Sequence, residues 1–156
     1  MNEYMKIAND LALDNLKTNV GGPFGAVIVK NNQVVGKGSN HVLKNNDPTA
    51  HAEVTAIRDA CRFLNTYDLS GCVLYTTCFP CPMCMSAIIW ANIQNVYYGN
   101  TREDADNIGF KDDIIYNNIN SLLNNTSSLL QLKQIDRNET IKTFQKFAEK
   151  EDKTIY

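Results

Sequence analysis

Two short segments carry the residues best suited to chemistry: His51-Ala52-Glu53 and, some thirty positions later, Pro80-Cys81-Pro82-Met83-Cys84. One imidazole and two thiolates are borderline-soft ligands that suit Zn²⁺, and three protein ligands leave a fourth tetrahedral position open for water. Glu53 lies two residues after His51, so on the first turn of a helix it can reach over that water without binding the metal. The pattern predicts one catalytic Zn²⁺ per chain, held by His51, Cys81 and Cys84, with Glu53 moving the protons.

Both halves of this pattern are expected at helix starts. Pro82 suits the first turn of a helix, because its missing N–H would be unpaired there. Cys81 and Cys84 are three residues apart, so one turn brings both sulfurs to one side, where the helix dipole favours thiolates. Thr49 is expected to cap a second helix that runs to about Phe63. Two helix N-termini should therefore converge on one cation.

Less specific interpretations exist for each part of the pattern. A Cys-x-x-Cys pair in a cytosolic protein is often a redox pair, and Cys78 adds a third thiol at the same spacing. We interpret Cys78 as a buried neighbour of the metal, because it ends a predicted strand before Pro80. A non-catalytic zinc module is the alternative from another class, but a purely structural site has no use for a carboxylate such as Glu53 over an open position.

Length, charge and cysteine content narrow the class of protein. A chain of 156 residues is long enough for one ordinary domain, 1–156, and too short for two. No apolar stretch approaches a membrane span, and the N-terminus resembles no export signal. Five cysteines without a secretory context favour a reducing cytoplasm. The net charge of −2 argues against a nucleic-acid partner.

The remaining sequence predicts the elements that must position these residues. Helical spacing predicts helices at 2–19, 49–63, 82–90, 101–108 and 139–150, and short apolar runs predict strands at 24–30, 33–38, 72–77, 96–99 and 129–135. Asn31-Asn32 fits a two-residue hairpin turn, and the asparagine-rich stretch 117–125 is expected to be a loop. Strands that alternate with helices predict a three-layer α/β/α sandwich with a mostly parallel sheet that opens with an antiparallel hairpin.

With these residues in place, the chain resembles the cytidine deaminase superfamily, whose signature is H-x-E followed by P-C-x-x-C. Within it, the chain is similar to the bacterial guanine deaminases. The likeness rests on the two zinc blocks, on Gly21-Gly22-Pro23-Phe24-Gly25, on Asn46-Asp47-Pro48-Thr49, and on Gly109-Phe110-Lys111-Asp112 through Tyr116. It extends over nearly the whole chain.

The resemblance implies a mixed five-stranded sheet and hydrolytic deamination of guanine to xanthine and ammonia. It also implies that Glu53 is the proton shuttle and that five residues contact the purine base: Asn40, Asp112, Phe24, Trp90 and Tyr156. Phe24 and Trp90 are equally compatible with plain core positions, and the sequence does not decide whether Asp112 or Asp113 faces the pocket. The family resemblance further implies a homodimer, in which the terminal helix and tail, about 137–156, are swapped between subunits.

Other deaminases remain as alternatives. Guanosine, cytosine and cytidine are separated from guanine by contacts at the edge of the ring, which sequence alone does not place. A tRNA adenosine deaminase would need a basic terminal helix, whereas this one carries Glu139, Glu149 and Glu151 among its lysines. One departure from the superfamily stands out: Phe79 occupies the position before Pro80, where Glu is usual.

Overall fold

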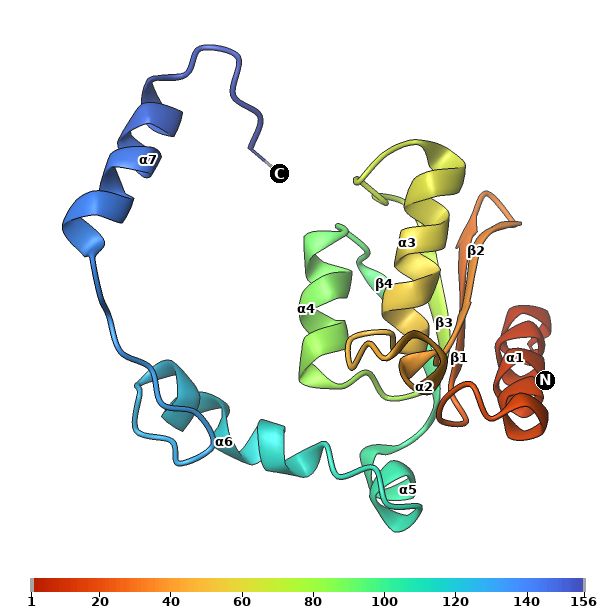
Figure 1. Ribbon diagram of the computed structural model, residues 1–156. Helices are drawn as coiled ribbons and strands as arrows, with labels where there is room; N and C mark the ends of the chain where they lie inside the picture. The colour runs from red at the N-terminus through yellow and green to blue at the C-terminus, as the bar shows by residue number, and fades with distance from the viewer. Residues whose placement is uncertain (1, 156) are drawn as a thin grey trace. The chain divides into compact units, whose positions relative to one another are not determined.

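The computed structural model describes residues 2–155, which divide into two compact units at residues 2–116 and 117–155. The first unit holds the sheet and the predicted metal ligands. It contains α1 (Glu3–Thr18), β1 (Gly25–Lys30), β2 (Gln33–Ser39), α2 (Val42–Asn45), α3 (Ala52–Leu64), β3 (Val73–Cys78), α4 (Pro82–Trp90), β4 (Asn95–Asn100), α5 (Arg102–Asn107) and the start of α6 (Asp113–Leu123) (Figure 1). The second unit contains the rest of α6 and α7 (Arg137–Glu149).

The described residues form one four-stranded sheet in the order β2-β1-β3-β4. Strand β1 pairs antiparallel with both β2 and β3, and only β3 and β4 run parallel. The expected hairpin is present, and Asn31 and Asn32 have the positive φ angles of 50° and 62° that its turn requires. The α/β fold class is confirmed, but the expectation of a mostly parallel sheet is wrong, because β3 returns antiparallel beside β1.

Alternate residues of β1 separate the two faces of the sheet. Ala26 and Ile28 belong to the larger core beneath α3 and α4, which also includes Ala56 and Ile88. Val27 and Val29 face α1 and pack against Ala8. Helices on both faces give the three layers that the sequence predicted (Figure 1). The helices that carry the metal ligands therefore share one face of the sheet.

Small residues bring α3 close to the sheet. A Cβ atom added to Gly38 of β2 would lie 2.3 Å from the carbonyl oxygen of Ala52 and 2.4 Å from the amide nitrogen of Ala56. These distances are far below van der Waals contact, so only glycine fits under the first turn of α3. The N-terminus of α3, where His51 and Glu53 lie, is thereby held against the end of β2.

Three local predictions need correction. Residues 129–135 form no strand within the described chain, so the sheet has four strands instead of five; an isolated strand without a pairing partner gains too little to persist. The stretch 117–125 is helical as far as Leu123, because Ile115, Ile119 and Leu122 continue a helical pattern through the asparagines. Helix α3 begins at Ala52 after the cap residue His51, and the Thr49 hydroxyl donates to Asp47 Oδ1 instead of capping the helix.

No helix within residues 2–155 has the length and apolar character needed to cross a membrane.

Candidate active site

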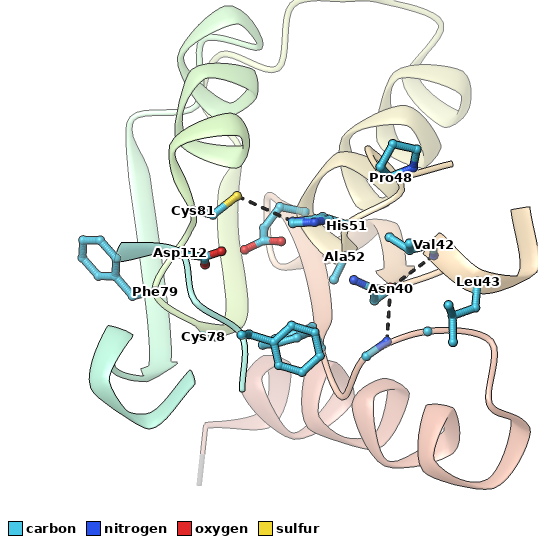
Figure 2. A pocket seen from close by; sticks show the side chains of 15 residues that line it. Asn40, Val42, Leu43, Pro48, His51, Ala52, Cys78, Phe79, Cys81 and Asp112 are labelled. Atoms are coloured by element: carbon cyan, nitrogen blue, oxygen red, sulfur yellow. Dashed lines mark hydrogen bonds between the residues drawn. The ribbon is translucent and has the colours of Figure 1, made fainter. Parts of the chain in front are cut away.

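His51, Cys81 and Cys84 come together at the N-terminal ends of two helices. Figure 2 shows His51 and Cys81 facing each other. His51 is the N-cap residue of α3 and Cys81 is the N-cap residue of α4, both in extended backbone conformation, with Cys84 on the first turn of α4. The Nδ1 atom of His51 lies 3.6 Å from the sulfur of Cys81 and 3.6 Å from that of Cys84. Ligands of a tetrahedral zinc ion stand about 3.5 Å apart, given bonds of about 2.0–2.3 Å. The three donor atoms therefore fit zinc.

The electrostatics of the two thiols favour a cation between them. Hydrogen bonding from the Cys84 thiol, and then from His51, lowers the pKa of Cys81 to about 4, so its sulfur is a thiolate at neutral pH. The same hydrogen bond holds the proton on Cys84 and raises its pKa, and the hydrogen bond with Cys81 raises the pKa of His51. Without a cation, these ligands share protons; with one, both sulfurs are deprotonated outright.

Glu53 is buried beside the ligands, with 6% of its surface exposed. The Thr76 hydroxyl donates to Oε1 at 3.1 Å, and Oε2 lies 3.4 Å from the Cys84 sulfur. Burial raises the pKa of Glu53 above its ordinary value, because the charged form loses its hydration. Because its pKa is raised, this carboxyl group holds a proton more readily than an exposed one does, which suits it to take up and release a proton.

Cys78 stays outside the ligand group, as predicted. Among the described residues, the donor atoms that converge within 4.8 Å belong to His51, Cys81 and Cys84 alone. The Cys78 thiol instead donates to the Thr101 carbonyl at 3.6 Å, and burial raises its pKa to about 11. It remains a neutral thiol in the wall of the adjoining cavity.

A cavity of about 460 Å³ lies beside Glu53 and two of the ligands, His51 and Cys81. Three of the predicted base contacts line it: Phe24, Asn40 and Asp112. The Asn40 side-chain oxygen accepts from the backbone N–H groups of Gly22 at 3.2 Å and Val42 at 3.1 Å, which turns its Nδ2 end to the cavity (Figure 2). The Asp112 carboxylate points into the same space as Cys81 and His51, and burial raises its pKa.

Asp112 lines the cavity, whereas Asp113 forms an ion pair with Arg102. Trp90 is not among the residues that line this cavity; it ends α4 with 67% of its surface exposed. Tyr156 lies outside the described residues. Sequence reasoning did not single out Phe110, whose ring meets Phe24 edge-on at 4.8 Å and completes the aromatic wall. The Gly109-Phe110 block was the available signal.

The unusual Phe79 is accommodated by aromatic packing. Phe79 is among the residues that line the cavity, and its ring meets Tyr98 edge-on at 5.0 Å and lies 6.4 Å from the Tyr116 ring. The Tyr116 hydroxyl donates to the Pro80 carbonyl, and the Arg102 guanidinium sits 3.9 Å from the centre of the Tyr116 ring. Apolar and cation–π contacts therefore support the loop before Cys81, where a glutamate is usual.

Comparison with known proteins gives a consistent result. The family model described as the cytidine and deoxycytidylate deaminase zinc-binding region matches residues 1–100. Guanine deaminase from Bacillus subtilis is 51% identical over 116 residues, which are 74% of this chain and 74% of that protein. The X-ray structure of guanine deaminase from Bacillus subtilis matches with a TM-score of 0.91 at 42% identity, and the match covers 100% of this chain and 99% of that one. A tRNA-specific adenosine deaminase from Aquifex aeolicus is 49% identical over 76 residues, which are 49% of this chain and 50% of that protein.

The matched region is the zinc-binding one, and it contains His51, Cys81 and Cys84. The prediction that zinc is the cofactor is confirmed.

Proposed function

The chain belongs to the cytidine and deoxycytidylate deaminase family, and we propose that it deaminates guanine hydrolytically to xanthine and ammonia. The observation that carries this proposal is one cavity that joins Glu53 and two of the zinc ligands, His51 and Cys81, to Asn40, Asp112 and two aromatic rings. This combination supplies a proton carrier next to a metal, together with polar and stacking contacts for a flat heterocycle.

Each residue has a chemical role in this reaction. When bound to His51, Cys81 and Cys84, zinc lowers the pKa of water from about 15.7 to about 7. Glu53 takes the proton that water loses and passes it to N3 of guanine as the water oxygen bonds to C2. Glu53 then takes the second proton from the hydroxyl now on C2 and delivers it to the exocyclic nitrogen, whose bond to C2 breaks to release ammonia and leave the C2 carbonyl of xanthine. One buried carboxyl group with a raised pKa can serve both directions.

The cavity wall supports a purine in one orientation. Nδ2 of Asn40 donates to an acceptor on the ring edge, and the Asp112 carboxylate accepts from a donor there. The ring of Phe24, braced edge-on by Phe110, covers one face of the base. These contacts agree with a base that carries both acceptors and N–H donors on its edges.

A second subunit is the proposed cover for the cavity. The unit at 117–155 keeps large apolar side chains exposed, including Leu129, Leu130, Leu132, Ile135 and Phe144. Exposed apolar side chains gain stability when they are buried, and exchange of an identical segment with a second copy of the chain is an inexpensive route to burying them. We infer a homodimer in which residues of about 137–156, with Tyr156, close the partner's site.

The five free cysteines are compatible with a reducing cytoplasm.

A panel of bases and nucleosides, with ammonia measured, tests the proposal. Guanine should give the largest kcat/KM, above guanosine, cytosine, cytidine and adenine. A tRNA substrate belongs in the panel because of the likeness to tRNA-specific adenosine deaminases. If ammonia were released faster from cytosine, from a nucleoside or from tRNA than from guanine, that compound would be the substrate instead. No release of ammonia from any compound in the panel, guanine included, would refute deaminase activity.

A further inference from the structure

Asn15 of α1 is a buried polar residue that the proposed reaction does not use. It lies on the same helix face as Ala8 and Ala12, and 3% of its surface is exposed. Its Nδ2 donates to the Gly22 carbonyl at 2.8 Å and to the Asn40 carbonyl at 2.7 Å. Burying an amide costs free energy unless the amide is hydrogen-bonded. The two hydrogen bonds of Asn15 offset that cost on this otherwise apolar face of the helix.

The two carbonyls that Asn15 binds belong to residues that also bind each other. Gly22 N–H donates to Asn40 Oδ1, so Asn15, Gly22 and Asn40 form a closed ring of hydrogen bonds. The loop is tightly packed there, because a Cβ added to Gly21 would lie 2.3 Å from both the backbone oxygen and the side-chain oxygen of Asn40. Only glycine permits that approach. Asn15 thus ties the glycine loop and the end of β2 to α1.

This ring controls which end of the Asn40 carboxamide faces the cavity. Gly22 and Val42 both donate to Oδ1, so a flipped carboxamide would turn its own N–H donors against two backbone donors. The Gly22 N–H adds to the cost of the flip beside the Val42 N–H, and Asn15 holds the carbonyl of Gly22. Asn15 therefore acts on the orientation of Asn40 from outside the cavity.

We propose that Asn15 is a positioning residue for substrate recognition: it holds Asn40 so that a hydrogen-bond donor, and not an acceptor, faces the purine. The proposal rests on the proposed function, since it assigns a role in binding the same substrate. It goes beyond that function because Asn15 itself touches neither the cavity nor the metal ligands.

A double-mutant cycle tests the proposal. Asn15→Ala should lower kcat/KM for guanine by about 10- to 100-fold, the effect of one misplaced buried hydrogen bond. Zinc content should stay at one per chain. In an Asn40→Ala background, the same change should add little, because the residue it positions is gone. Asn9→Ala, on the same helix and outside the ring, is the matched control and should leave kcat/KM unchanged.

NMR gives a readout that does not depend on activity. The side-chain amide signals of Asn40, assigned by their loss in Asn40→Ala, should form one pair in the wild-type protein and should shift or broaden in Asn15→Ala. Asn15→Leu keeps a side chain of similar size without the donor and should have the same effects if the alanine variant folds poorly. The proposal would be overturned if these variants kept the wild-type kcat/KM and unchanged Asn40 signals. It would also be overturned if Asn15→Ala lowered kcat/KM by the same factor in the Asn40→Ala background as in the wild-type protein. If the wild-type protein does not act on guanine but the Asn40 signals respond, the proposed function fails and the positioning role stands.

Discussion

Glu53→Gln separates the proton carrier from the metal site. Glutamine keeps the shape of the side chain, and its Oε1 can still accept from the Thr76 hydroxyl that lies 3.1 Å from Glu53 in the wild-type protein. The variant cannot take up the proton that water loses. We therefore expect kcat for guanine to fall by about 10²- to 10⁴-fold, which raises the barrier by about 3–5.5 kcal/mol at 1.36 kcal/mol per tenfold.

The assay is ammonia release at saturating guanine, with zinc measured on the same preparation. Zinc should remain at one per chain, because Glu53 is not among the three converging donor groups. Glu103→Gln, an exposed glutamate on α5, is the matched control and should keep wild-type activity.

The same variant makes a prediction about stability and pH. Burial raises the pKa of Glu53, so the folded protein binds this proton more tightly than the unfolded chain does. The protonated Glu53 makes its full contribution to the free energy of unfolding below about pH 4.3, the pKa of a glutamate in the unfolded chain. That contribution is lost as the pH rises through the higher pKa of Glu53 in the folded protein. In metal-free protein, Tm of Glu53→Gln relative to the wild type should therefore increase with pH above about 4.3.

Two results would refute this reasoning. Near-normal turnover in Glu53→Gln with full zinc would remove Glu53 as the proton carrier. A Tm difference between Glu53→Gln and wild type that stays constant with pH would show that the carboxyl group is not destabilised by burial.

Three further predictions concern the metal, the core and the tail. Metal analysis should find no zinc in Cys84→Ala and one zinc per chain in Cys78→Ser, and zinc loss in Cys78→Ser would contradict the ligand assignment. Acidification should release zinc from the wild-type protein, because the ligands take up protons. Gly38→Ala should destabilise the fold by about 1–3 kcal/mol by overpacking against α3, measured by denaturant unfolding, and an unchanged midpoint would contradict that packing. Removal of residues 152–156 should reduce kcat/KM for guanine far more than it reduces Tm, and a monomer by light scattering that stays fully active without its tail would exclude a shared site.

The local parts of the site could be predicted from the sequence. The spacing of His51, Cys81 and Cys84 works because each segment starts a helix, and one turn sets the separation of Cys81 and Cys84. Proline and asparagine signals also act over a few residues, which is why the start of α4 and the hairpin at Asn31-Asn32 were predictable. Here the relevant interactions lie within one helical turn or one hairpin.

Other features depend on residues far apart in the chain. How whole elements pack decides that Asp112 and not Asp113 lines the cavity, and that Trp90 is exposed. It also decides the ring of hydrogen bonds among Asn15, Gly22 and Asn40. The stretch 129–135 has the composition of a strand, but a strand exists only where a neighbour accepts its hydrogen bonds, and the described chain offers none to it. The residue types and their short spacings thus determined the chemistry. Tertiary packing decided which side chains face the substrate, because side-chain direction and strand pairing are set by partners that lie distant in sequence.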